Sequence, residues 1–150
     1  VTIAAFRDAP HTGHTEQFIV RALRRRGRLS VSLVADDAGM IVGHVAISPV
    51  EISSGDDGWF GLGPISVTPS WQRRGVGTSL MREALARLRA LGARGCVVLG
   101  EPGYYARFGF RAEPSLILPD VPAEYFQALS FDGGMPSGIV AYDEAFAATS

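Results

Sequence analysis

Seven consecutive residues in the middle of the chain have the types and spacing of a phosphate-binding loop. They are Gln72-Arg73-Arg74-Gly75-Val76-Gly77-Thr78, between an extended segment that ends at Val67 and a long helical pattern. Glycines at positions 75 and 77 leave main-chain N–H groups free to converge on phosphate oxygens, aided by the helix dipole and the flanking arginines. The segment predicts an anion site. Taken alone, a strand-to-helix turn that merely contains glycine explains it equally well.

Two other phosphate-binding loops are excluded by the residues present. A P-loop requires Gly-Lys followed by Ser or Thr, which the chain lacks, and a dinucleotide fingerprint requires a third glycine where Leu80 stands.

The elements on either side of this loop are the best defined in the chain. Trp59 to Val67 reads as a strand that contains Gly61, Gly63 and Pro64, residues that weaken a ladder and indicate a bulge or a ligand close to the main chain. Gly75 to Leu91 reads as a helix. Its inward residues are predicted to be Leu80, Ala84, Leu85, Leu88 and Leu91, with Glu83 paired to Arg87 and Gly92 as the stop.

The remaining pattern completes an alternation of helices and strands. Predicted helices span His14 to Arg26 and, in one or two turns, Tyr104 to Phe108; predicted strands span Val31 to Ala35, Met40 to Ser48, Gly95 to Leu99, Tyr125 to Phe131 and Ile139 to Tyr142. Asp36-Asp37-Ala38-Gly39 makes the first two strands a hairpin, Phe110 resumes extended structure, and Tyr125 to Leu129 fits a helix as well as a strand.

Composition limits the class of protein. The 150 residues are 47% hydrophobic and 19% charged, which is typical of one globular domain over residues 1–150, and the net charge of -1 gives no general attraction to nucleic acid or anionic membrane. The run Arg24-Arg25-Arg26 favours a helix C-terminus over a nucleic-acid patch. The chain has one cysteine and no zinc-ligand spacing, so we expect no metal. It has no apolar stretch near the ~20 residues of a membrane span and no signal-like N-terminus, so we expect a cytoplasmic protein.

The loop and its surroundings resemble the GNAT N-acetyltransferase superfamily. The Gln-x-x-Gly-x-Gly pattern looks like the family's acetyl-CoA signature, Leu62 to Val67 is similar to its fourth strand, and Tyr104-Tyr105-Ala106-Arg107-Phe108-Gly109-Phe110 looks like its later tyrosine and Gly-Phe motif. Further features resemble a bacterial subgroup of small acetyltransferases: Ser32 to Ala35, Gly43 to Val45, Ser48 to Val50, Val121-Pro122 and Ala145-Phe146.

The resemblance implies an α/β (α+β) fold with a mixed, mostly antiparallel sheet flanked by helices. Its fourth and fifth strands, here Trp59 to Val67 and Gly95 to Leu99, would splay apart to admit the pantetheine arm of acetyl-CoA. Main-chain groups of Ile65, Ser66 and Val67 would bind the arm. The cradle and groove residues implied for the cofactor are Gln72, Arg73, Arg74, Gly75, Val76, Gly77, Thr78, Tyr104 and Phe108.

The implied reaction is direct attack of a primary amine on the thioester in a ternary complex. Tyr105, four residues before Gly109, matches the family's general acid, and Tyr104 is the rival; both could instead simply pack the groove. The base is less defined: Glu101 is a candidate or a helix-start carboxylate, and His44 is a candidate or a hydrogen-bonded structural residue. Cys96 reads as a small buried hydrophobe rather than a nucleophile.

The acceptor, a small molecule or a peptide, is not identified by the motifs. Asp56, Asp57, Asp120 and Glu124 lie in loops that could border its groove, and the tail from Leu116 to Phe146 would shape either this groove or a homodimer contact. A CoA-binding regulatory module with little or no catalytic activity is the alternative function.

Overall fold

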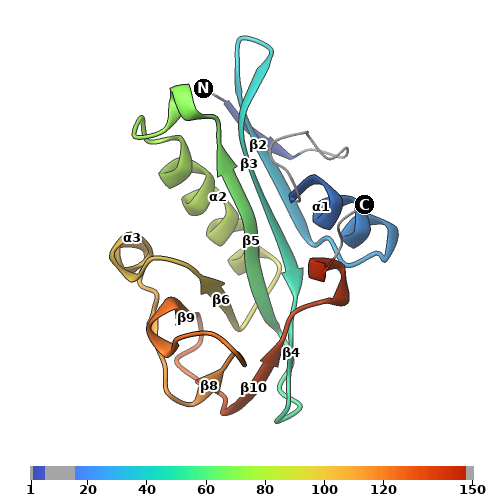
Figure 1. Cartoon of the computed structure of the whole chain (residues 1–150), viewed down its shortest axis with the longest axis vertical. Helices are drawn as coiled ribbons and strands as arrows, with labels where there is room; N and C mark the ends of the chain where they lie inside the picture. Colours follow the sequence, from blue (N-terminus) through green and yellow to red (C-terminus); the bar gives the residue numbers. More distant parts are fainter. Residues whose placement is uncertain (1, 6–15, 148–150) are drawn as a thin grey trace.

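The computed structural model describes residues 2–5 and 16–147 and has a seven-stranded central sheet (Figure 1). The strand order is β1-β2-β3-β5-β6-β9-β7, and β5 and β6 are the one parallel pair of neighbours in the described sheet. The bounds are β1 Thr2–Ala5, β2 Val31–Asp37, β3 Met40–Pro49, β5 Trp59–Val67, β6 Gly95–Leu99, β7 Arg111–Ala112 and β9 Phe126–Ser130. The predicted mixed, mostly antiparallel sheet is confirmed.

A smaller sheet packs on the lower part of one face. It has the order β4-β10-β8, with β4 Glu51–Ile52, β8 Leu116–Ile117 and β10 Gly138–Ala141. Buried Val50, Leu116 and Val140 of this layer meet Trp59 and Phe126 of the central sheet in one apolar cluster. The tail therefore folds back as an additional layer, and β9 and β10 belong to different sheets.

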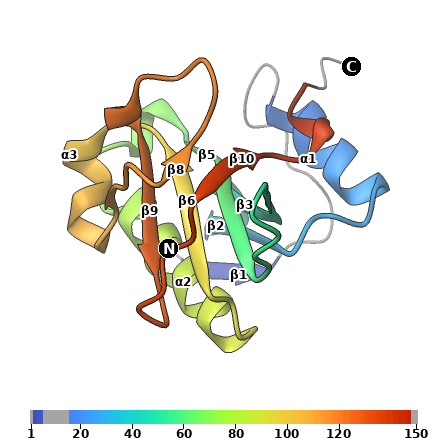
Figure 2. The ribbon, with the colours of Figure 1, turned by 90° about the horizontal axis from the view of Figure 1, so that it is seen from below.

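The helices cover opposite faces of the central sheet (Figure 2). Helix α2 (Val76–Ala90) packs on β2, β3 and β5, whereas α1 (Glu16–Arg25) lies on the other face beside the 3-10 helix η4 (Glu144–Ala147). Short helical turns complete the chain: α3 (Pro102–Tyr105), η1 (Pro69–Trp71), η2 (Ala106–Phe108) and η3 (Ala123–Tyr125).

Helix α2 follows its predicted pattern except at its last position. Leu80, Ala84, Leu85 and Leu88 are buried, and Arg87 pairs with Glu83 at 3.1 Å. The prediction that Leu91 points inward is wrong, because the helix ends at Ala90 and the side chain of Leu91 is 61% exposed.

The predicted first helix is described only in part. Its basic last turn is present in α1, and Gly27 follows with a φ of 68°. The predicted start at His14 lies outside the described residues. Beyond the helix, Arg26 binds Asp143 at 2.7 Å and Glu144 at 2.6 Å, so this arginine fastens α1 to the end of the chain.

Strands β5 and β6 form a fork that is closed at one end and open at the other. They pair from Trp59 with Gly95 to Leu62 with Val98, and the pairing stops there although β5 continues to Val67. A register shift against β3 falls between Leu62 and Ile65, at the predicted bulge. In Figure 1, β6 and α3 turn away from the upper half of β5. The implied splaying of these strands is confirmed.

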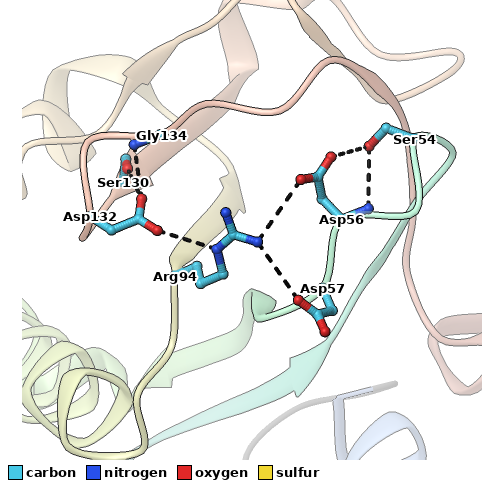
Figure 3. A network of polar contacts seen from close by, with 7 residues as sticks. All are labelled: Ser54, Asp56, Asp57, Arg94, Ser130, Asp132 and Gly134. Atoms are coloured by element: carbon cyan, nitrogen blue, oxygen red, sulfur yellow. Dashed lines mark hydrogen bonds and ion pairs between the residues drawn. The ribbon is translucent and has the colours of Figure 1, made fainter.

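An ionic network holds the closed end of the fork (Figure 3). Arg94, just before β6, lies 3.2 Å from Asp132, 3.7 Å from Asp57 and 4.0 Å from Asp56. Asp132 also accepts a bond from the N–H of Gly134, and these contacts hold its pKa below the ordinary value. The loop before β5, the residue before β6 and the turn after β9 are therefore joined at the closed end of the fork.

Candidate active site

A cavity of about 450 Å³ opens at the N-terminus of α2. The residues that line it come from β5, the loop before α2, the first turn of α2 and the α3–η2 segment: Val67, Gln72, Arg73, Gly75, Gly77, Thr78, Tyr104 and Arg107. This volume lies within the range of small-molecule sites. Five of the residues predicted for the pyrophosphate cradle, one predicted for the pantetheine arm and one predicted for the groove wall therefore share one cavity.

The loop below this cavity is shaped by its backbone and by Gln72. The side-chain amide of Gln72 donates to the carbonyl oxygen of Val67 at 3.1 Å, so it ties the loop back to the end of β5. Gly75, the N-cap of α2, has a φ of 82°, and Arg73 has a φ of 65°. A left-handed residue costs little only for glycine, which explains the residue type at position 75.

Main-chain N–H groups at the start of α2, beside this cavity, have no acceptor within the helix. The first backbone bond of the helix runs from the N–H of Ser79 to the carbonyl of Gly75 at 3.0 Å. The N–H groups of Val76, Gly77 and Thr78 precede that bond, as expected for a helix N-terminus. Together with the helix dipole, they favour an anion at this position.

The two arginines of the loop have different surroundings. Arg73 lines the cavity, whereas the guanidinium of Arg74 lies 4.9 Å from the ring centre of Trp71 and is not part of the lining. The side chain of Val76 is buried in the main core, so only its main chain is available to a ligand.

Tyr104 and Arg107 form the opposite wall of the cavity. A Cβ on Gly77 would lie 3.0 Å from the Tyr104 hydroxyl, so the missing side chain at position 77 makes room for this wall. Arg107 stacks 4.7 Å above the Tyr104 ring, and Phe108 supports the same ring at 5.5 Å. We did not predict Arg107 as a cradle residue from the sequence. Its spacing of three residues from Tyr104 in a predicted helical segment could have indicated that both side chains lie on one face.

Tyr105 lies behind Tyr104 and is buried. Its ring contacts Tyr104 at 5.0 Å and Phe110 at 6.0 Å between centroids, and it does not line the cavity at the start of α2. Burial, with a smaller contribution from Tyr104, raises the pKa of the Tyr105 phenol above its ordinary value. The phenol therefore stays protonated at neutral pH, as a proton donor must.

The two candidates for the general base, Glu101 and His44, have different surroundings. Glu101 is exposed at the end of β6, and its main-chain carbonyl accepts bonds from the N–H groups of Tyr104 (3.1 Å) and Tyr105 (3.2 Å) at the start of α3. Its side chain makes no capping bond. The helix-start position is thus confirmed through the backbone, and the carboxylate is left facing solvent.

His44 and Cys96 are structural residues. His44 is 1% exposed, bonded to the Ser32 hydroxyl at 3.1 Å, and burial lowers its pKa to about 4. Its neighbour Gly43 faces α2, so His44 faces the other side of the sheet. Cys96 is fully buried, and burial raises the pKa of its thiol far above the ordinary value, which leaves it unreactive.

A second cavity of about 450 Å³ lies at the open end of the fork, on the α1 face. We call it the apolar groove; it is lined by Ile19, Leu62, Gly63, Pro64, Leu99, Leu118, Pro119, Val121, Tyr142 and Phe146. Tyr142, which reasoning from sequence did not single out, ends at a buried hydroxyl without a hydrogen-bond partner among the described residues. No local sequence pattern predicts the position of Tyr142, because only the tertiary fold brings the segment after β10 to the fork.

The acidic residues predicted near an acceptor divide into two groups. Asp56 and Asp57 bind Arg94 at the closed end of the fork, away from either cavity. Asp120 stands between the groove residues Pro119 and Val121, and Glu124 is exposed in η3. Of the four, Asp120 adjoins the groove.

Residues 2–5 and 16–147 contain no group of three or more His, Cys, Asp or Glu side chains that could hold a metal ion. Over the same ranges, no helix has the length and apolar character needed to cross a membrane.

The chain is similar to known acetyltransferases. The model of an acetyltransferase (GNAT) domain matches residues 28–112. The Escherichia coli K12 N-acetyltransferases YhbS and YjhQ are 40% and 35% identical over 96 and 100 residues, which are 63% and 65% of this chain. These matches span 58% of YhbS and 54% of YjhQ, little more than half of each curated relative.

Two solved structures share the fold over almost the whole chain. A GNAT family acetyltransferase from Brucella melitensis, in complex with acetyl-CoA, has a TM-score of 0.82 and 43% identity, covering 97% of both chains. Escherichia coli YhbS, in complex with CoA, has a TM-score of 0.86 and 30% identity, covering 99% of this chain and 93% of the other.

Proposed function

The chain belongs to the GNAT acetyltransferase family, and on that premise we propose that it transfers an acetyl group from acetyl-CoA to a primary amine by direct attack in a ternary complex. The observation that carries the proposal is the cavity at the start of α2, with its free N–H groups and with Arg73 and Arg107 in its walls. Such a cavity suits the pyrophosphate of CoA, which similar proteins from Brucella melitensis and Escherichia coli hold as acetyl-CoA or CoA.

The open edge of β5 suits the pantetheine arm. Val67 lines the first cavity and Leu62 lines the apolar groove, and the five steps between them span roughly 16 Å at about 3.3 Å per residue. Along this length β5 pairs with β3 on one edge and with no strand of the described residues on the other. We propose that main-chain groups of Ile65, Ser66 and Val67 bind the arm along the free edge.

The remaining roles in the cradle follow from side-chain position. We propose that the N–H groups from Arg73 to Thr78 bind the pyrophosphate and that Arg73 and Arg107 neutralise its charge. Gln72 acts by shaping the loop, because its amide is already bonded to Val67. Tyr104 and Phe108 complete the wall beside the cofactor, and Arg74 stays on Trp71.

Acyl transfer needs a proton donor for the sulfur and an acceptor for the amine proton. Bound acetyl-CoA supplies an activated acyl carbon and a thiolate leaving group. We assign proton donation to Tyr105, whose raised pKa keeps its phenol protonated. Glu101, exposed at the end of β6, is the proposed base, acting directly or through water.

Calorimetric titration with acetyl-CoA and CoA, followed by a thiol-release assay with a panel of amines, tests this function. Micromolar binding together with thiol release is expected. Binding without release from any amine would favour a regulatory CoA-binding module, and absence of binding would refute the proposal.

A further inference from the structure

We infer that a small acidic protein, which carries its acyl group on a phosphopantetheine arm, docks on a row of arginines beside the cradle and delivers that arm to the same site. The arginine row consists of Arg107, Arg82 and Arg89, in that order from the first cavity along α2. The inference rests on the proposed acetyl transfer, because it names a second acyl donor for that reaction.

Each guanidinium of the arginine row lies over an aromatic ring. The pairs are Arg107 over Tyr104 at 4.7 Å, Arg82 over Phe108 at 5.7 Å and Arg89 over Phe131 at 4.6 Å. The three arginines are exposed, whereas the three rings are partly buried against the main core. Stacking of this kind restricts the arginine side chain and leaves its N–H edges free for carboxylate or phosphate oxygens. The row is therefore organised before an anionic partner arrives.

The arginine row lacks the carboxylates that neutralise neighbouring arginines. On the same helix Arg87 pairs with Glu83 at 3.1 Å, and beyond η2 Arg111 pairs with Glu113 at 2.8 Å. Within residues 2–5 and 16–147, no carboxylate forms an ion pair with a member of the row. A chain of net charge -1 thus has one local surface of uncompensated positive charge, which attracts an acidic partner.

The spacing of the row along α2 fits a helix as the docking element. Arg82 and Arg89 are seven residues apart, so they point to the same side of α2 and lie about 10.5 Å apart at about 1.5 Å per residue. Carboxylates seven residues apart on a second helix have the same spacing. Single-stranded nucleic acid fits less well, because the rings are covered by guanidinium groups and offer no free face on which bases stack.

The row begins at the wall of the proposed CoA site. Phe108, which lies under Arg82, contacts the Tyr104 ring at 5.5 Å, and Tyr104 and Arg107 line the first cavity. A carrier protein attaches its acyl group through the same phosphopantetheine arm that forms part of CoA, but it has no adenosine. Contacts between the carrier and the row would supply affinity that the missing adenosine cannot.

The basic residues of this chain cannot compete for the acyl group. All 14 of its Lys and Arg residues are arginine. A lysine amine beside a thioester would itself be a nucleophile, whereas a guanidinium stays protonated at neutral pH. In the transfer, the nitrogen of the acceptor amine forms a bond to the thioester carbonyl carbon and the bond from that carbon to sulfur breaks. The amine proton passes to the proposed base, the proposed acid protonates the sulfur, and the carrier leaves with a free thiol.

Calorimetric titration of the whole protein at about 50 mM salt tests the docking surface. The probes are acetyl-CoA, acetyl-phosphopantetheine, and an acidic acyl carrier protein in its acetylated and its apo form. The acetylated carrier should bind at least about tenfold more tightly than acetyl-phosphopantetheine, because it engages the row as well as the arm site. The apo carrier should bind weakly through the row alone. An acetylated carrier that binds no more tightly than the arm alone would overturn the inference.

Two double variants, each of which removes two positive charges, separate the row from general electrostatics. Arg82→Gln with Arg89→Gln should weaken binding of the acetylated carrier roughly threefold to tenfold. Arg25→Gln with Arg87→Gln should leave it nearly unchanged, because Arg25 is on α1 and Arg87 lies on the side of α2 that faces β2. Equal losses in the two double variants would overturn the inference. So would an equal loss for acetyl-CoA in the row variant, since the row would then belong to the cofactor.

Salt dependence of the wild-type protein provides a measurement that needs no variant. Carrier affinity should fall steeply toward about 0.5 M salt, where exposed charges are screened, and an unchanged affinity would overturn the inference. A single-stranded RNA of the same net charge is the competing partner. If the RNA binds more tightly than the apo carrier and loses affinity in the row variant, the assignment to an acidic protein is wrong.

The proposed acetyl transfer is judged separately, by thiol release from acetyl-CoA with the panel of amines. Release from acetyl-CoA without carrier binding would refute the inference and keep the transferase. Carrier binding that depends on the row, without release from either donor, would refute the transferase and keep the docking surface.

Discussion

Gly75 has the left-handed conformation required at the start of α2 and open space where a side chain would project. Gly75→Asp would place a carboxylate where we propose phosphate, and we expect CoA affinity to fall roughly 10- to 100-fold. Calorimetric titration measures this loss. Gly133→Asp is the matched control, because Gly133 has a φ of 85° and the same open space but lies in the turn after β9. Equal losses in the two variants would mean that the cradle is elsewhere.

Tyr105 is the proposed proton donor, and its hydroxyl makes no hydrogen bond to the described residues. Tyr105→Phe should leave CoA affinity nearly unchanged and lower kcat by about 100-fold or more. Because burial raises the pKa of the phenol, the wild-type rate should persist at alkaline pH until that raised pKa is passed. Steady-state kinetics across pH check both points. An unchanged kcat would leave Tyr105 as a packing residue.

His44 makes stability depend on pH in a definite direction. Its pKa is about 4 in the folded protein and near 6.5 when unfolded, so the unfolded chain binds more protons between these values. Its contribution is complete above pH 6.5 and declines as the pH falls to 4, by about 3 kcal/mol. Urea unfolding at pH 7, 5.5 and 4.5 measures this slope. His44→Gln should flatten it, and identical slopes would show that His44 does not titrate as described.

Single residues of the cradle were predictable where their role is local. Gly75, Gly77 and Thr78 line one cavity because the loop and the first turn of α2 are adjacent in sequence, and their binding of phosphate stays a prediction. Arg74 differs, since Trp71 offers its guanidinium a ring at 4.9 Å. Whether the Arg74 side chain lies on Trp71 or lines the cavity depends on three-dimensional contacts, which residue spacing does not predict.

At the scale of the elements, Gly77 of α2 should affect both the stability of the helix and the proposed binding of CoA. Gly77→Ala should raise the free energy of unfolding by up to about 1 kcal/mol, because alanine is the better helix former. It should also weaken CoA binding threefold or more, since the new Cβ lies 3.0 Å from the Tyr104 hydroxyl and pushes that wall. Thermal unfolding and calorimetry on the same sample test the pair of effects. A stabilised variant with unaltered CoA affinity would show that Tyr104 is not part of the site.

Elements with strong patterns were predicted almost to the residue, and weak ones were not. Trp59–Val67 and Gly95–Leu99 have their predicted bounds, because continuous apolar runs between turns admit few alternatives. The ambiguity at Tyr125 to Leu129 resolves as strand β9 after the turn η3, since β6 and β7 provide partners on both sides. Strands β4 and β8 have two residues each and no periodicity, so only pairing with β10 defines them.

For the molecule as a whole, the closed end of the fork is fixed by charges from three segments. Arg94→Gln should lower the Tm modestly at about 20 mM salt, because it disconnects Asp56, Asp57 and Asp132 (Figure 3). The difference should vanish near 0.5 M salt, where exposed charges are screened. Arg25→Gln, at an exposed arginine on α1, is the control. A deficit that persists at high salt would indicate packing by the arginine stem instead.

The arrangement of the two cavities could not be read from the sequence. The cradle and the tyrosine motif are local, but the apolar groove combines α1, β5, β6, the 118–121 segment and the end of the chain. Arg26 and its partners Asp143 and Glu144 are more than 100 positions apart and together hold α1 beside η4. Long-range contacts of this kind determine which side chains line the apolar groove.

The free edge of β5 also affects how the protein behaves at high concentration. A strand with unsatisfied N–H and C=O groups is a template on which another polypeptide can add itself and seed aggregation. Pro64 offers no N–H there, which interrupts that template at one position. A pantetheine arm bound along Ile65 to Val67 would shield the remainder, so bound CoA would also protect this edge from pairing with another chain.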